Sequence, residues 1–290
     1  MTAEHDVRTW EARGKRFTVD GRAIWALDVP ATTATDADPL LVLHGFPSCS
    51  FDWRHVLDAL SARRRVVLVD FLGFGLSDKP DLRYSMRLQA DVVEGVARQL
   101  GLERVALLTH DMGDTVGGEL LARSLEGTLP FAITQRVLTN GSIYIDMAHL
   151  TTGQQLLLSL PDEPTELVNA DGYRAGLAGT FSAKSAVPDD ELDAQWLLVA
   201  HNDGNTLLPR TIRYIEDRRA EERRFTGAIE AHPSPLTVVW GADDPIAIVA
   251  MTETLRAARP DIDLTVLDGV GHYPMIEAPE RFTAAVTKNL

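Results

Sequence analysis

The stretch LLTHDMGDTVGGELL, residues 107–121, begins as an apolar run and continues as a segment rich in Gly and Leu. Its first part predicts a buried strand and its second part a helix, so the chain must turn sharply between them. Asp111 lies at this turn, within the sequence Thr109-His110-Asp111-Met112-Gly113. A strand–turn–helix corner with small residues on both sides exposes its central side chain and aims the following N–H groups at it. Thr109 stands where such a corner usually has its first glycine.

Outward from this corner, short apolar runs alternate with segments of helical periodicity. The runs are rich in β-branched residues and predict strands buried on both faces; they are 40–45, 64–70, 104–110, 135–141, 235–241 and 262–269. The helical segments are 85–100, 113–125, 247–258 and 279–289. Asp20-Gly21, between two β-like runs, predicts an N-terminal hairpin. The sequence therefore predicts an α/β fold with a mostly parallel central sheet, an N-terminal hairpin and helices on both faces.

Residues 142–230 interrupt this alternation, because they lack buried-strand patterns and contain helical stretches instead. We expect them to form an inserted helical cap, with 1–141 and 231–290 making up the core domain. Within this segment, the charged run EDRRAEERR (216–224) has Glu and Arg recurring at i, i+4. That spacing favours a solvated helix face over a specific binding patch.

Composition limits the function classes. The chain has 290 residues, 45% of them hydrophobic, and a formal net charge of −14. A nucleic-acid partner requires clustered Lys and Arg and is not expected. Cys49 is the only cysteine, and no apolar run is long enough to span a membrane. We therefore expect a cytoplasmic protein without a membrane partner, and composition leaves a monomer and a homodimer open.

Three sites at predicted strand ends carry groups suited to catalysis. Asp111 is the first, although taken alone it is more simply interpreted as a helix N-cap. The second is WGADDPI (240–246), where Asp243 or Asp244 follows a strand, and the third is a loop that carries His272. Taken alone, that histidine is more simply a surface residue. Open α/β sheets place active sites at strand ends, and the chain order nucleophile, acid, histidine is that of one known catalytic triad.

A fourth stretch, HGFP (44–47), follows an earlier strand of the predicted sheet. The backbone N–H of Phe46 and that of Met112 can together form an oxyanion hole. By contrast, GFGLSD (73–78) lacks the third glycine and the helix start of a dinucleotide-binding loop. We therefore expect neither a cofactor nor a metal.

Several motifs resemble those of α/β hydrolases, in the group that includes epoxide hydrolases and haloalkane dehalogenases; they are HGFPSCSFDW, DFLGFGLSDKP, THDMGD, WGADDP and GHYPMIEAPERF. HDMGDTVGGELL and HNDGNTLLPRTIRYI are most similar to the mesoderm-specific-transcript-like branch. The resemblance covers nearly the whole chain and is weakest in the cap. It implies Asp111 as nucleophile, His272 as base and Asp244 as the acid that orients His272. Asp244 is favoured over Asp243 because it directly precedes proline, as in the family's G-x-x-D-P loop.

An aspartate at the corner implies chemistry that differs from that of a serine. Aspartate is ionised at neutral pH and can attack an sp³ carbon directly, which gives a covalent alkyl-enzyme ester. His272 would then take a proton from water, and the water would attack the carbonyl of that ester. The substrate would be a small apolar-to-amphipathic organic molecule, with water as the second reactant.

The leaving group distinguishes the activities within this family. Epoxide opening needs a proton donor, and Tyr214 matches the position of a cap tyrosine in the resembling family; Tyr144 and Tyr173 are candidates for a second one. The dehalogenases carry tryptophan after the nucleophile and often a polar residue within HGxP, but here those positions are Met112 and Phe46. The sequence therefore favours an epoxide hydrolase that gives diols. The alternatives are a dehalogenase-like or other α/β-hydrolase activity, such as ester hydrolysis, and a non-catalytic ligand-binding protein.

Overall fold

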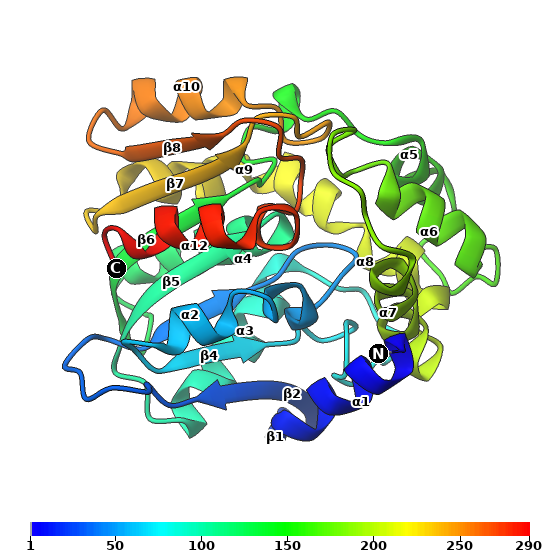
Figure 1. Cartoon of the computed structure of the whole chain (residues 1–290), viewed down its shortest axis with the longest axis horizontal. Coiled ribbons are helices and arrows are strands. Elements are labelled where there is room, and N and C mark those ends of the chain that lie inside the picture. Colours follow the sequence, from blue (N-terminus) through cyan, green and yellow to red (C-terminus); the bar gives the residue numbers. More distant parts are fainter. Residues whose placement is uncertain (1) are drawn as a thin grey trace.

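A computed structural model describes residues 2–290, which contain an eight-stranded sheet (Figure 1). The strand order is β1-β2-β4-β3-β5-β6-β7-β8. β1 and β2 form an antiparallel hairpin, β2 pairs antiparallel with β4, and the remaining neighbours pair in parallel. The strands are β1 Lys15–Val19, β2 Arg22–Val29, β3 Leu40–Leu43, β4 Val66–Val69, β5 Arg104–His110, β6 Ala132–Thr139, β7 Leu236–Gly241 and β8 Asp263–Leu267. The mostly parallel sheet and its N-terminal hairpin were both predicted and are confirmed.

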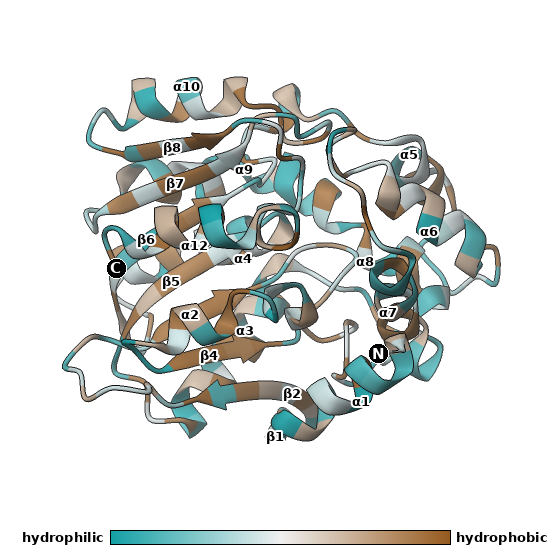
Figure 2. Cartoon of the chain, in the orientation of Figure 1, coloured by the Kyte–Doolittle hydropathy of each residue, from teal (hydrophilic) through white to brown (hydrophobic). Residues whose placement is uncertain are grey.

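Helices cover both faces of the sheet, as predicted (Figure 1). One face carries α3 (Met86–Gln99), α4 (Met112–Leu125) and α9 (Tyr214–Ala231), and the other carries α2 (Leu57–Ser61) and α12 (Pro279–Thr287). The remaining helices of the core are α1 Ala3–Arg13, η1 Ser50–Trp53, α10 Ala250–Ala258 and α11 Pro274–Glu277. Figure 2 shows apolar residues concentrated in the strands and polar residues on the outer helices. Because both faces are covered, every residue of β3, β4 and β7 is buried.

Within the described residues, the chain between β6 and β7 forms helices and no strand. These are η2 Ile145–Met147, α5 Thr152–Ser159, α6 Ala170–Ala178, α7 Asp189–Ala200, η3 His201–Leu207, α8 Leu208–Thr211 and α9. α7 packs against α1, while α9 lies along α4 in the layer that covers the sheet. We propose that residues 142–230 form a cap on the core of residues 1–141 and 231–290. None of the helices within 2–290 combines the length and apolar character needed to cross a bilayer.

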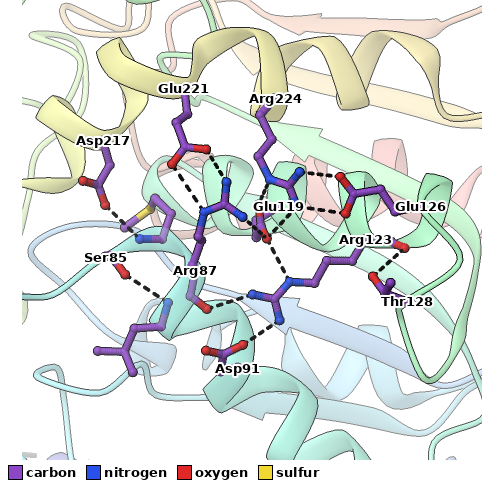
Figure 3. Close-up of polar contacts among 12 residues, drawn as sticks. Ser85, Arg87, Asp91, Glu119, Arg123, Glu126, Thr128, Asp217, Glu221 and Arg224 are labelled. Atoms are coloured by element: carbon purple, nitrogen blue, oxygen red, sulfur yellow. Dashed lines mark hydrogen bonds and ion pairs between the residues drawn. The ribbon is translucent and has the colours of Figure 1, made fainter.

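The prediction of a solvated face for residues 216–224 is wrong in part. Glu221 pairs with Arg87 of α3, and Arg224 pairs with Glu119 and Glu126 of α4 (Figure 3). Arg218 is 98% buried, with 2% of its surface exposed. The charges contact neighbouring helices rather than one another, because α9 packs along α4.

Candidate active site

The parallel strands bring the predicted site residues to one edge of the sheet. Asp111 follows β5, Asp244 follows β7, and His272 follows β8. All three are buried, with 2%, 4% and 2% of their surface exposed, so their interactions with one another are shielded from water.

The turn at Asp111 has an unusual backbone. Its φ of 49° and ψ of −113° lie in a region that residues with a side chain rarely adopt. Tight neighbours hold it: a Cβ on Gly45 would lie 2.6 Å from the Asp111 Cβ, and one on Gly113 would lie 2.6 Å from the His44 carbonyl oxygen. The Asp111 side chain caps no N–H of α4. The strained turn thus presents the carboxylate to the site instead of using it to begin the helix.

Thr109 fits the position where glycine was expected because the opposing residue is a glycine. A Cβ on Gly117 would lie 3.0 Å from the Thr109 methyl group. The Thr109 hydroxyl donates to the carboxyl group of Asp114. That hydrogen bond joins the end of β5 to the first turn of α4 across the corner.

The backbone N–H of Phe46 donates to Asp111 Oδ2 at 2.8 Å. The loop that carries it is fixed by His44, whose Nδ1 donates to the Gly45 carbonyl oxygen and whose Nε2 accepts from the Phe71 N–H. Met112 is the first residue of α4, where a helix leaves its N–H without an intrahelical acceptor. Asp111 Oδ2 therefore already lies beside one donor of the proposed oxyanion hole. The Phe46 N–H does not hold the other carboxylate oxygen, Oδ1.

His272 lies beside Asp244 and not beside Asp243. His272 Nδ1 donates to Asp244 Oδ2 at 2.8 Å, while the other oxygen of Asp244 accepts from the N–H groups of Ile246 and Ala247. Asp243 instead accepts from the Ser182 hydroxyl and pairs with Lys184. Neither aspartate caps the next helix, because α10 begins only at Ala250.

Electrostatics favour a charged His272. Burial alone would lower its pKa, but the carboxylate of Asp244 outweighs burial and, with a contribution from Asp111, raises the pKa to about 9. Because Nδ1 is engaged by Asp244, Nε2 is the nitrogen that can exchange a proton with a reactant.

Three residues that the sequence analysis did not identify hold this arrangement. Asn140, at the end of β6 with φ of 47°, donates to Asp244 Oδ2 at 2.7 Å. His110 Nε2 donates to the His272 carbonyl oxygen at 2.8 Å. Glu277 accepts from the N–H groups of Gly271 and Tyr273, which flank His272. The predicted strand, 135–141, included Asn140, whereas β6 ends at Thr139; a polar residue near the end of a predicted strand was the one signal in the sequence.

The three tyrosines considered as proton donors differ in their surroundings. Tyr214 is buried, its ring lies 5.5 Å from that of Phe46, and burial and the charge of Asp111 raise its pKa. The Tyr144 hydroxyl donates to Glu230 at 2.7 Å and is therefore occupied. The Tyr173 hydroxyl is buried and has no hydrogen-bond partner among residues 2–290. Tyr214 and Tyr173 thus remain as candidate donors.

A cavity of about 220 Å³ is lined by Tyr173 and His272, whereas Asp111, Tyr214 and Tyr144 are not among its lining residues. Its walls come from the core at Phe46, His272 and Tyr273, and from the chain between β6 and β7, which contributes five leucines among its fourteen lining residues. His272 is the only ionisable group of its lining apart from the phenols of Tyr173 and Tyr273. Within residues 2–290, no group of three or more His, Cys, Asp or Glu residues is placed to hold a metal ion.

Comparison with known proteins gives the family. A model of the alpha/beta hydrolase family matches residues 40–285. The "Putative hydrolase LipZ" of Mycobacterium tuberculosis is 40% identical over 281 residues, which is 96% of this chain and 96% of that protein. The "Mesoderm-specific transcript protein" of Mus musculus is 34% identical over 291 residues, covering 96% of this chain and 86% of that protein.

A solved structure, "Epoxide hydrolase CorEH", has the same fold, with a TM-score of 0.74 at 15% identity over 95% of this chain and 97% of that one. At such low identity the similarity shows the fold alone. The resemblance predicted from the motifs, including that to the mesoderm-specific-transcript-like branch, is confirmed. With its eight-stranded sheet, its family match over residues 40–285 and these relatives, the chain belongs to the alpha/beta hydrolase family.

Proposed function

We propose that this hydrolase opens epoxides by attack of Asp111 on carbon and then hydrolyses the resulting ester to a diol. The observation that carries the proposal is the strained turn of Asp111, with one carboxylate oxygen held 2.8 Å from the Phe46 N–H. A carboxylate in this place attacks carbon without first losing a proton, unlike a serine.

In the first step, the free oxygen of Asp111 forms a bond to an epoxide carbon as the carbon–oxygen bond of the ring breaks. The epoxide oxygen leaves as an alkoxide and takes the proton of the Tyr214 hydroxyl. The products are a hydroxyalkyl ester on Asp111 and a phenolate on Tyr214. Burial next to Asp111 raises the pKa of Tyr214, which keeps the phenol protonated until the alkoxide forms.

Esterification removes the charge of Asp111, one of the groups that raise the pKa of His272. In the second step, His272 in its neutral form takes a proton from water, and the hydroxide attacks the ester carbonyl carbon. The oxyanion that forms is stabilised by the N–H groups of Phe46 and Met112. The ester bond then breaks, the diol leaves with the proton of the new carboxyl group, and Asp111 is again a carboxylate. His272 returns its proton to Tyr214. Asp244 stabilises the imidazolium during this step.

The cavity supports an uncharged substrate. Apart from His272 it presents no side chain that is charged at neutral pH, and its apolar walls favour an apolar or amphipathic epoxide. A halide would need weak N–H donors beside the nucleophile, but the residue that follows Asp111 is Met112. These features favour the epoxide over the haloalkane.

The experiment is to trap the ester. His272→Gln should slow the second step more than the first, so that intact-mass spectrometry during reaction with styrene oxide shows protein plus substrate. His5→Gln, an exposed position in α1, is the matched control and should form diol at the wild-type rate without a persistent mass shift.

Wild-type protein should give diol from styrene oxide and little bromide from 1-bromohexane. An unshifted mass of folded His272→Gln protein with styrene oxide, 1-bromohexane and an aryl ester would overturn the two-step mechanism. Efficient bromide release without diol formation would mean that the substrate is a haloalkane and not an epoxide.

A further inference from the structure

Arg218 of α9 is a buried cation beside the proposed site. It is 2% exposed, and no carboxylate among residues 2–290 lies within ion-pair distance of its guanidinium group. Burying an ionised group is unfavourable unless another group compensates for the lost hydration. Arg224 of the same helix, by contrast, contacts the carboxylates of Glu119 and Glu126. Arg218 therefore has an electrostatic environment that helix packing alone does not explain.

The contacts of Arg218 are with the turn that carries Asp111 and with the ring of Tyr214. Its Nε donates to the Thr115 hydroxyl at 2.8 Å, in the first turn of α4, and its Nη2 lies 3.5 Å from the carbonyl oxygen of Asp111. Its Cζ lies 5.0 Å from the centre of the Tyr214 ring. The guanidinium group thus touches the turn of the proposed nucleophile and the proposed proton donor at the same time.

A second buried carboxyl group, that of Asp114, shares this region. Burial and the negative charge of Asp111 raise its pKa, whereas Arg218 lowers it. Among the described residues no Asp114 oxygen lies within ion-pair distance of Arg218, whose contacts are instead with Thr115, with the Asp111 carbonyl oxygen and with the Tyr214 ring.

We infer that Arg218 is a positioning residue for epoxide opening: its cation stabilises the negative charge that develops on Tyr214 when the phenol gives its proton to the alkoxide. The inference rests on the proposed function. A cation over an aromatic face is attracted to the ring, and the attraction increases when the ring carries a phenolate. The hydrogen bond to Thr115 fixes the guanidinium in that place.

The test compares Arg218→Met, Arg218→Lys and the matched control Arg219→Met. Arg219 is the next residue of α9 and is exposed. Ester formation from styrene oxide is measured in single turnovers in the His272→Gln background, together with the thermal midpoint of each variant. We expect Arg218→Met to slow ester formation by about tenfold to a hundredfold, Arg218→Lys to restore part of the rate, and Arg219→Met to change nothing.

The thermal midpoint separates this role from a structural one. Because a buried unpaired cation is replaced by an apolar side chain, Arg218→Met should melt at or above the wild-type temperature while losing rate. A double-mutant cycle identifies the residue through which Arg218 acts: in the Tyr214→Phe background, Arg218→Met should have little further effect on the rate.

Three outcomes would overturn the inference: an unchanged rate in Arg218→Met, a full additional loss in the Tyr214→Phe background, or a large drop in thermal midpoint that accounts for the lost rate. Each leaves the proposed function standing, because ester still forms in His272→Gln. Failure of the proposed function is recognised separately, by the absence of any ester in His272→Gln with Arg218 intact, and it removes the inference as well.

Discussion

The arginines at the two ends of the contact between α9 and α4 differ in whether a carboxylate neutralises their charge. At the far end from the site, Arg224 pairs with Glu119, whose side chain is fully buried and is also contacted by Arg87 and Arg123 (Figure 3). At the near end, Arg218 is buried without a carboxylate in contact. Charges around Glu119 are neutralised locally and tie three helices together. The charge of Arg218 is not neutralised in this way, so it can act on reacting groups.

Glu119 and Asp111, the carboxylates at the two ends of this contact, also differ in the groups that donate hydrogen bonds to them. Glu119 accepts from Arg123 at 2.8 Å and from Arg224 at 2.5 Å, whereas Asp111 accepts from one backbone N–H. Three arginines beside Glu119 outweigh the effect of burial and lower its pKa. We therefore expect changes at Glu119 to alter stability and changes at Asp111 to alter chemistry, and the following predictions test that separation.

Asp111→Asn should have the largest effect. An amide is not a nucleophile toward an epoxide, so turnover should fall by about 10⁴-fold or more, while the free energy of unfolding changes little. Diol formation and urea unfolding measure the two quantities. Residual activity within a factor of ten of the wild type would remove Asp111 from the mechanism.

Asp244→Asn should come next, with a loss of about 10³-fold, because the imidazolium of His272 loses its stabilising charge. Asp243→Asn is the matched control in the same loop, and its contacts with Ser182 and Lys184 lie away from His272. It should keep the rate of ester hydrolysis within about threefold of the wild type. The reverse ranking of the two variants would mean that the orienting acid is assigned to the wrong residue.

Glu119→Gln should lower the free energy of unfolding by about 2–4 kcal/mol, because three arginines lose their buried carboxylate partner. The value is measured by urea unfolding. The ester-forming rate of the folded protein should stay within about twofold of the wild type, since Glu119 belongs to the structural end of the contact. A larger loss of the ester-forming rate at unchanged free energy of unfolding would contradict the purely structural role of Glu119.

Tyr214→Phe should slow ester formation from styrene oxide by about 10²-fold, within the range of a positioned general acid. Tyr144→Phe is the control, because its hydroxyl is engaged by Glu230. Tyr173→Phe belongs in the same series, since its unpartnered hydroxyl lies in a residue that lines the cavity. If Tyr173→Phe loses more rate than Tyr214→Phe, the donor and the residue on which Arg218 acts must be reassigned.

The smallest effect concerns pH. His272 must be neutral to take a proton from water, so ester hydrolysis should speed up as the pH rises through the pKa of His272, which is about 9 in the free protein. Forming the ester removes the charge of Asp111, one of the groups that raise this pKa. The midpoint for ester hydrolysis, followed by mass spectrometry of the decaying ester, should therefore lie below pH 9. A midpoint at or above 9 would contradict the influence of Asp111 on His272.

The sequence by itself determined the features that depend on neighbours along the chain. Continuous β-branched runs predicted the strands of the parallel sheet, and Asp20-Gly21 predicted the hairpin, where φ is 48° and 76°. The corner at Asp111 was recognisable because its strand, turn and helix are consecutive. The order of Asp111, Asp244 and His272 followed from the strand ends, since parallel strands bring their ends to one edge of the sheet.

The tertiary structure alone decided which polar side chains are buried and what they contact. The i, i+4 pattern of residues 216–224 predicted that their charged side chains are exposed to solvent. Arg218 is instead buried and contacts Thr115, 103 positions earlier in the chain. Asn140 reaches Asp244 across 104 positions, and the cavity joins the HGFP loop to α5 and α6. Periodicity reports which face of a helix is polar, but the free energy of burying a charge depends on the groups that packing brings to it from distant parts of the chain.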